Sequence, residues 1–369
     1  PAHFNGIKFK GDFAGPADVS ITRDIERQLY KSKIIIGEFE KLVKKNKIVI
    51  KDVSGPYIRF LKSYVDMRVL KEASLRILVD VMYGTSSDYF SRILKGTNCS
   101  VDILHNSINP SFGGTNPEPI ARNLKELSKE MASRRYDIGI ANDGDADRVA
   151  AMSPDGEFIN GQKMLCLLLL HMVEDRKLTG AVVRSIQTTQ ILDKIARKYN
   201  LKIYERQVGF KHVSKLMRTK DILIGGEESG GIGYKNYIPE RDGILSGLLL
   251  LEMMAMRKKS IIEIMKGMEK EFGMPFYKRE DVRLPLNERN RVFKKLSGNV
   301  LEKFFGRVIK ARKNLGGMKL IFEDESWIFF RPSGTESILR ICTEASTKEK
   351  ASQLVEDGKK FLSASNLIG

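Results

Sequence analysis

The stretch Asp143-Gly144-Asp145-Ala146-Asp147-Arg148 follows directly on an apolar run, residues 136–141, that is typical of a buried strand. Three carboxylates at alternate positions, with small residues between them, can direct three oxygen atoms at one hard cation. Mg²⁺ is commonly bound by a few carboxylates together with water or a substrate phosphate. The arginine after the acids suits a phosphate that lies across such a metal. The alternative is an acidic surface turn, for which Asp-Gly is an ordinary dipeptide.

Strand and helix patterns alternate on both sides of this stretch, which predicts α/β domains with largely parallel sheets. The expected strands are 75–81, 136–141, 181–183, 201–204 and 221–224, and the expected helices are 53–69, 87–94, 121–131, 162–172, 189–199, 210–217 and 245–256. The tail from residue 274 differs, with expected strands at 280–284, 318–322, 327–330 and 338–342 and a helix at 347–362. It is typical of a smaller α+β domain.

Length and composition limit the function classes. With 369 residues, of which 42% are hydrophobic, the chain is expected to form about two to four domains. Its most apolar segments, 164–173 and 244–256, are too short to span a bilayer and are predicted to be buried helices. Three widely spaced cysteines predict neither a disulfide framework nor a zinc site, so a cytoplasmic location is expected.

The formal net charge of +17 raises the question of a nucleic-acid partner. The basic residues are dispersed over polar helix faces and lack the interleaved aromatic residues of a single-strand binder. We therefore expect a solvated basic surface that attracts anionic metabolites, with neither nucleic acid nor membrane as a partner.

A second loop, Gly225-Gly226-Glu227-Glu228-Ser229-Gly230-Gly231, also follows directly on an apolar strand. Carboxylates accept hydrogen bonds from sugar hydroxyls, and a serine hydroxyl both donates and accepts them. Glycine lets the backbone approach a ligand closely. The loop therefore suits a sugar, and the alternative is a flexible surface turn.

A third loop, Arg331-Pro332-Ser333-Gly334-Thr335-Glu336-Ser337, lies between two predicted strands. Backbone amides, Arg331 and the two hydroxyls of Ser333 and Thr335 can converge on one phosphate, and Arg340 on the following strand can reach the same anion. The alternative is an ordinary hairpin turn.

Together, and in this order and spacing, the three loops resemble the metal, sugar and phosphate loops of the α-D-phosphohexomutases, the phosphoglucomutase/phosphomannomutase superfamily. Supporting matches lie at 116–119, 208–211 and 237–243, so the resemblance spans the whole chain. It implies a multidomain architecture in which repeated three-layer α/β domains with mixed sheets precede a C-terminal α+β domain. The implied domains are 1–52, a remnant of the first, 53–155 with the metal loop, 156–273 with the sugar loop, and 274–369 with the phosphate loop.

The resemblance also implies a reaction. An active-site phosphoserine donates its phosphoryl group to a hexose phosphate, and the resulting hexose 1,6-bisphosphate turns over and returns its other phosphoryl group, with Mg²⁺ bridging the serine phosphate. Asp143, Asp145 and Asp147 match the Mg²⁺ ligands, and Glu227 and Ser229 match the sugar-binding residues. Lys8, Arg148 and Lys211 match catalytic positions. The non-reacting phosphate is implied to bind Arg331, Ser333, Gly334, Thr335 and Arg340.

The chain opens Pro1-Ala2-His3-Phe4-Asn5-Gly6-Ile7-Lys8, which resembles the family segment that follows the catalytic serine. The serine is therefore expected upstream of Pro1, and the sequence looks like a fragment whose partner is an N-terminal piece carrying that serine. Gly231 replaces a histidine of some family branches, and Ser337 replaces a common proline.

Two function classes stay open. One is a phosphohexomutase that interconverts hexose 1-phosphate and hexose 6-phosphate, of glucose, mannose or both, with the fragment alone inactive. The other is an inactive module that binds sugar phosphates. The sequence does not distinguish glucose, mannose and glucosamine phosphates, although Glu-Glu-Ser-Gly-Gly favours the phosphoglucomutase-like branches.

Overall fold

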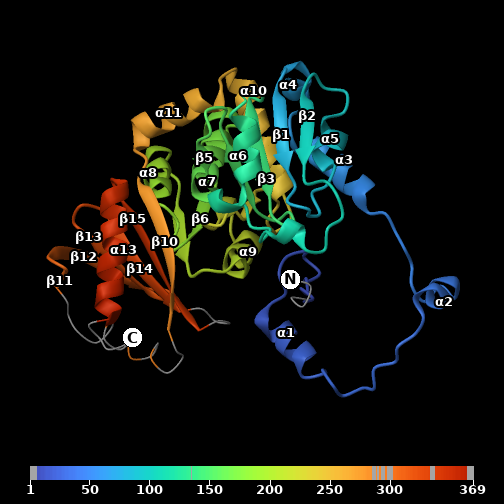
Figure 1. The fold of residues 1–369 in the computed structure, drawn as a ribbon, viewed down its shortest axis with the longest axis horizontal. Helices are drawn as coiled ribbons and strands as arrows, with labels where there is room; N and C mark the ends of the chain where they lie inside the picture. The colour runs from blue at the N-terminus through green and yellow to red at the C-terminus, as the bar shows by residue number, and fades with distance from the viewer. Residues whose placement is uncertain are drawn as a thin grey trace.

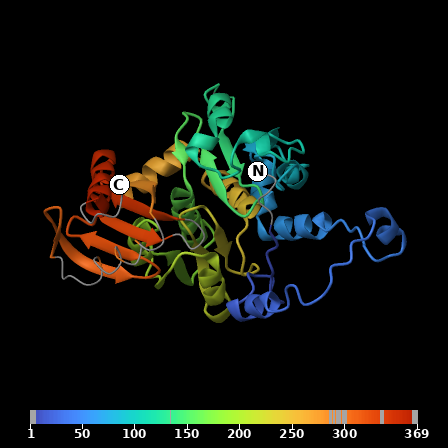
Figure 2. The same ribbon diagram turned by 60° about the horizontal axis from the view of Figure 1, so that its bottom comes forward.

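The computed structural model describes residues 6–133, 135–284, 302–332 and 337–363, with the single residues 288, 291 and 296. Figure 1 shows three sheets with their helices and a long N-terminal segment that runs around one side of the molecule. In this segment, α1 (Val19–Glu26) and α2 (Phe39–Lys44) bury none of their residues. Both views show α2 far from the sheets (Figures 1 and 2). Near the start of the N-terminal segment, Asp18, which precedes α1, forms an ion pair with Arg218 of α9 at 2.9 Å.

The first sheet has five strands in the order β2-β1-β3-β4-β5. Strands β1 to β3 are parallel, and β4 and β5 are antiparallel to their neighbours. Its elements are α3 (Ser54–Tyr64), α4 (Met67–Glu72), β1 (Arg76–Asp80), α5 (Tyr89–Leu94), β2 (Ser100–Leu104), α6 (Lys125–Met131), β3 (Ile138–Asn142), β4 (Val149–Met152) and β5 (Phe158–Ile159). The prediction of a single helix over 53–69 is wrong. Asp66 separates α3 from α4, and as the N-cap of α4 it accepts a hydrogen bond from the backbone N–H of Arg68.

The second sheet has four strands in the order β7-β6-β8-β9, of which only β9 is antiparallel. Its elements are α7 (Gly161–Leu170), the π turn η3 (His171–Asp175), β6 (Ala181–Ser185), α8 (Ile191–Lys198), β7 (Ile203–Arg206), α9 (Phe210–Thr219), β8 (Ile222–Gly226), β9 (Ile232–Tyr234), α10 (Gly243–Arg257) and α11 (Ile261–Phe272). The helix α11 was not expected from the sequence.

The third sheet is antiparallel, in the order β10-β15-β14-β13-β12-β11, with α13 packed on one face. Its elements are β10 (Phe276–Arg283), β11 (Lys303–Phe304), β12 (Arg307–Asn314), β13 (Met318–Phe322), β14 (Trp327–Pro332), β15 (Ile338–Ala345) and α13 (Lys348–Ser363). The expected α+β tail is confirmed.

The expectation of largely parallel sheets needs a correction at two places that matter for the site. The first loop joins β3 to the antiparallel β4, and the second joins β8 to the antiparallel β9. Connections this short can reverse a chain but cannot make the crossover that a parallel pair requires. Both loops are therefore hairpin turns at the ends of buried strands, and the sheets are mixed.

The first two sheets share one hydrophobic core. The helix α10 contacts β3, β4, α4 and α5 of the first sheet, although it follows the second sheet in the chain. Gly247 allows this approach, because a Cβ there would lie 2.7 Å from the Phe90 ring. The two apolar segments therefore form buried helices as predicted, within α7 and α10. Among the described residues, no helix is long and apolar enough to cross a membrane.

Candidate active site

The turn between β3 and β4 brings the three aspartates together. One carboxylate oxygen each from Asp143, Asp145 and Asp147 lies within 4.8 Å of the others. Ala146 adopts the left-handed conformation, with φ of 56°, which allows so tight a turn. Asp143 is buried, Asp147 half-buried and Asp145 exposed. An all-oxygen set that opens to water on one side fits Mg²⁺, which usually keeps several of its waters.

Arg148 is held by acids from two segments. Its Nε donates to Asp143 Oδ2 at 2.5 Å, and its backbone N–H donates to Asp143 Oδ1 at 2.9 Å. Its Nη1 donates to Glu118 Oε1 at 3.1 Å. Burial raises the pKa of Asp143 to about 6, although the charge of Arg148 opposes the rise. The guanidinium is thereby fixed beside the metal loop, and its contact with a phosphate stays a prediction.

Lys8 reaches the same loop from the N-terminal segment. Its Nζ forms a short ion pair with Asp145 and lies 4.0 Å from Asp147 Oδ2. The hydrogen bond to Asp145 raises the pKa of Lys8. Burial disfavours ionisation of Asp145, but the hydrogen bond and charge of Lys8 outweigh it and lower the pKa of Asp145. The structure thus brings Lys8 to the metal loop, although 137 positions of sequence separate it from Asp145.

The turn between β8 and β9 is the sugar-type loop. Glu227 is buried, and its Oε1 accepts the amide of Gly209 at 2.7 Å. Burial and the neighbouring Glu228 raise the pKa of Glu227 to about 7. Ser229 is half-buried within the turn. Lys211 is exposed in the first turn of α9, two residues after the Gly209 that contacts Glu227.

The first two loops pack directly on each other. The amide of Val149 donates to the carbonyl of Gly230 at 3.1 Å. Gly230 has φ of 91°, and a Cβ there would lie 2.2 Å from the Val149 carbonyl oxygen. Only glycine satisfies both conditions, so the residue type of the sugar-type loop sets its distance from the metal loop.

The strands of the third loop approach the second loop from the third sheet. Arg331 on β14 lies directly opposite Arg340 on β15, so both side chains project from the same face. The charge of Arg331 opposes the rise in the pKa of Glu227, so the two groups lie within electrostatic range of each other. Arg340 Nε lies 3.5 Å from Asp281 Oδ2 on β10. Ser333, Gly334 and Thr335 lie outside the described residues, and their predicted roles are untested.

Three family models match the chain in sequence order. They describe α/β/α domain II of phosphoglucomutase/phosphomannomutase over residues 55–156, α/β/α domain III over 160–272, and the C-terminal domain over 281–359. The chain belongs to the α-D-phosphohexomutase superfamily. The multidomain α/β architecture with mixed sheets and a final α+β domain, predicted from the sequence, is confirmed.

Individual phosphohexomutases resemble this chain over nearly its whole length. A phosphoglucomutase/phosphomannomutase of Thermococcus kodakarensis is 29% identical over 98% of this chain and 76% of its own. A phosphoglucosamine mutase of Campylobacter curvus is 28% identical, with the same two coverages of 98% and 76%. The crystal structure of a candidate phosphomannomutase from Thermus thermophilus has a TM-score of 0.81 and 28% identity, and the match covers 96% of this chain and 74% of that one.

Two residues of the candidate site, Arg241 and Glu118, were not predicted from the sequence. Arg241 forms a short ion pair with Asp147 of the metal loop, and its Nη1 lies 3.6 Å from Glu227 Oε2 of the sugar-type loop. Its stem packs on Gly231, where a Cβ would lie 2.3 Å from Arg241 Cδ. The match over 237–243 drew attention to this segment, but no local pattern identifies its partner, 94 residues away. Glu118, the partner of Arg148, was likewise only part of a matching stretch.

Proposed function

We propose that this chain is the Mg²⁺- and substrate-binding part of a phosphohexomutase that interconverts hexose 1-phosphate and hexose 6-phosphate through hexose 1,6-bisphosphate. The observation that carries the proposal is the contact between the metal loop and the sugar-type loop, with Arg331 of the third sheet within electrostatic range of the latter. The two loops meet through the hydrogen bond from the Val149 amide to the Gly230 carbonyl, and the charge of Arg331 acts on Glu227. Mutase activity in the superfamily and the names of its relatives support the reaction class.

The three aspartates would hold Mg²⁺, which supplies charge neutralisation for the transferring phosphoryl group. In the described chain these acids are balanced by Lys8, Arg148 and Arg241. We propose that Arg148 contacts the transferring phosphate, and that Lys8 and Lys211 provide countercharge or exchange protons near it. Glu227 and Ser229 would accept and donate hydrogen bonds to the sugar hydroxyls. Arg331 and Arg340, with Ser333, Gly334 and Thr335, would hold the non-reacting phosphate.

We propose a glucose phosphate as the first substrate to test. Glucose 1-phosphate and Mg²⁺ should both bind to residues 1–369 in calorimetric titrations, and Asp145→Ala should weaken Mg²⁺ binding because it removes one of three carboxylates. Equal Mg²⁺ affinity in that variant would exclude the aspartate site. No binding of glucose, mannose or glucosamine phosphates would exclude the function.

The reaction itself is tested with a coupled assay for glucose 6-phosphate. We propose that the serine nucleophile is encoded upstream of Pro1. We also propose that the successive domains are residues 1–52, 53–155, 156–273 and 274–369. The proposed location of the protein is the cytoplasm. A polypeptide that includes the upstream coding region should turn over glucose 1-phosphate, whereas residues 1–369 alone should bind it without turnover. Turnover by residues 1–369 alone would refute an upstream nucleophile, and binding without turnover by both would favour the binding module.

A further inference from the structure

A lysine is buried where the third sheet meets the second. Lys319 lies on β13, and its side chain is 0% exposed. Its Nζ donates to the carbonyl oxygen of Ile186 at 2.7 Å and lies 3.8 Å from the centre of the Trp327 ring. Ile186 follows β6 directly, whereas Trp327 begins β14. One ammonium group therefore contacts a strand of each sheet.

The strand β14 leads into the predicted phosphate loop, and β6 pairs with β8, the strand that leads into the sugar-type loop. Trp327 precedes Arg331 by four positions on the same strand. Ser185, next to Ile186, lies with its Oγ 3.5 Å from Glu228 Oε2 in the sugar-type loop. The backbone N–H of Ile186 donates to the carbonyl of Arg206 at 2.8 Å. Hydrogen bonds therefore hold both the N–H and the carbonyl of Ile186. Lys319 thus lies on a short path between Arg331 and the Glu227–Glu228 pair.

Among the described residues, the junction also contains an apolar cluster and further polar contacts. A small apolar cluster of Ile186, Trp327, Phe329 and Cys342 lies between the sheets. Lys313, opposite Lys319 on β12, pairs with Glu205 at 2.7 Å. Glu344 Oε1 accepts two hydrogen bonds, one from the Trp327 indole N–H at 3.0 Å and one from the backbone N–H of Gln190 at 3.1 Å.

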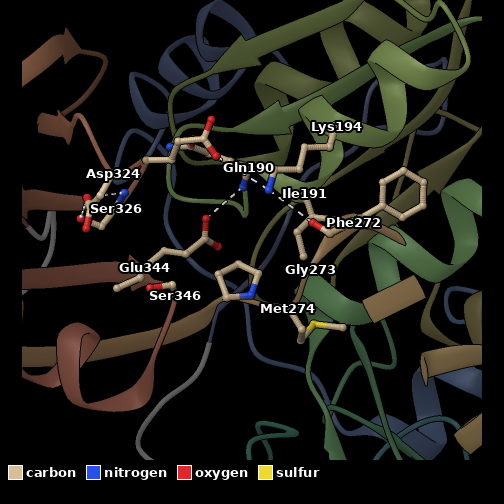
Figure 3. A pocket seen from close by; sticks show the side chains of 13 residues that line it. Gln190, Ile191, Lys194, Phe272, Gly273, Met274, Asp324, Ser326, Glu344 and Ser346 are labelled. Atoms are coloured by element: carbon tan, nitrogen blue, oxygen red, sulfur yellow. Dashed lines mark hydrogen bonds and ion pairs between the residues drawn. The ribbon is translucent and has the colours of Figure 1, made fainter. Parts of the chain in front are cut away.

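Beside Glu344 the junction opens into a pocket of about 250 Å³ (Figure 3). Its walls come from both sides of the junction, namely the start of α8, the segment 272–275, the turn 324–326 and the end of β15. Figure 3 shows the Gln190–Glu344 hydrogen bond crossing it. Polar contacts that cross the junction, such as this one, therefore help to set the relative orientation of the two sheets, together with the apolar cluster.

An apolar side chain at position 319 would fill the same space without the cost of desolvating an ammonium group. The charged groups around Lys319 are of both signs, with Arg184 on β6 and Lys313 on β12 opposed by Glu205 on β7 and Glu344 on β15. What a lysine alone contributes is a directed bond to the Ile186 carbonyl together with contact to the Trp327 ring.

We propose that Lys319 is a positioning residue, which sets the distance between Arg331 and the sugar-type loop so that a hexose phosphate is held at both ends. This inference rests on the proposed function. Lys319→Met should raise the dissociation constant for glucose 1-phosphate about tenfold, since it removes the hydrogen bond to the Ile186 carbonyl that joins the two sheets. It should leave Mg²⁺ affinity unchanged, because the metal loop lies on the first sheet. Lys319→Arg, which keeps the charge and donors, should bind more tightly than Lys319→Met.

The matched control is Lys310→Met, an exposed lysine on β12 of the same sheet, which should change neither affinity. A second readout is the distance distribution between spin labels at Arg197→Cys on α8 and Lys348→Cys on α13, in a Cys99→Ser background. It should broaden in Lys319→Met and remain narrow in Lys310→Met, without a lower melting temperature in either. Arg197 and Lys348 are both exposed.

Unchanged glucose 1-phosphate affinity and an unchanged distance distribution in Lys319→Met would overturn the positioning role. So would parallel losses of melting temperature and affinity in both Lys319 variants, which would indicate a purely structural role. If Lys319→Met does not fold, the comparison of Lys319→Arg with Lys310→Met decides the question by the same two readouts. Absence of binding by the wild-type chain would instead refute the proposed function and, with it, the positioning role.

Discussion

At the scale of single residues, the site is defined by which cation neutralises which acid. Asp143 is paired with Arg148, Asp145 with Lys8 and Asp147 with Arg241. A divalent metal therefore competes with side-chain cations for the same oxygens. Arg241 is the most informative of the three, because it also lies near Glu227 of the sugar-type loop.

Replacing Arg241 by methionine should affect the two ligands in opposite directions. Without the guanidinium, Asp147 loses its closest cation, so Mg²⁺ affinity should rise by about three- to tenfold, the worth of roughly 1 kcal/mol. Glucose 1-phosphate affinity should fall by a similar factor. Without Arg241 the pKa of Glu227 rises, so less of Glu227 is the carboxylate that accepts hydrogen bonds from the sugar. Calorimetry with each ligand measures both effects, and replacement of the exposed Arg197 on α8 by methionine is the control. An unchanged Mg²⁺ affinity would contradict the competition.

Arg331 is expected to carry the charge recognition of the non-reacting phosphate. Arg331→Ala should weaken glucose 1-phosphate binding by roughly 1.5–3 kcal/mol, the worth of hydrogen bonds to charged groups. The loss should depend on the phosphate, so glucose itself should bind equally to both proteins. Equal binding of glucose 1-phosphate would mean that the loop after β14 is only a hairpin turn.

At the scale of elements, two hairpin turns place the loops against each other. The turn of β3 and β4 contacts the turn of β8 and β9 through Val149 and Gly230. The strands β4 and β9 were not predicted, because runs of four and three residues show too little alternation to be told from loop. The strands before each turn were predicted, since both are continuous apolar runs.

Gly230→Ala should be more destabilising than Gly156→Ala, although both glycines have positive φ, 91° and 83°. A Cβ at Gly156 meets nothing within 4 Å, so only backbone strain of about 1 kcal/mol is expected. At Gly230 the Cβ would lie 2.2 Å from the Val149 carbonyl oxygen, which raises the expected cost to about 3 kcal/mol or more. Urea unfolding of both variants measures the difference, and equal costs would mean that the two turns are not in contact.

At the scale of the whole molecule, the third sheet is joined to the rest through a small junction that contains a buried ammonium. Burial lowers the pKa of Lys319 to about 7, from a usual value of 10.5, and the charge of Arg184 adds to the effect. Between these two pH values the unfolded chain binds one more proton than the folded chain. The free energy of unfolding therefore rises with pH in this window, and the contribution is lost as pH falls through the folded-state pKa.

Between pH 7 and pH 10 this group should increase the free energy of unfolding by at most about 4 kcal/mol. The measurement is the difference between wild type and Lys319→Met in urea unfolding at each pH, which cancels the contributions of other groups. The wild type should gain stability relative to the variant as pH rises. A difference that does not change with pH would show that Lys319 titrates normally in the folded chain.

The sequence by itself predicted the metal and sugar-type loops, the apolar strands before them and the change to an α+β tail. These features depend on periodicity and residue type within short segments, where chemistry and spacing are directly readable. The tertiary structure alone decided that Arg241 joins two loops and that Lys319 contacts Ile186 at a separation of 133 residues. Contacts of this kind arise from how α10 and the third sheet pack on distant elements, and no local pattern encodes the partner of a long charged side chain.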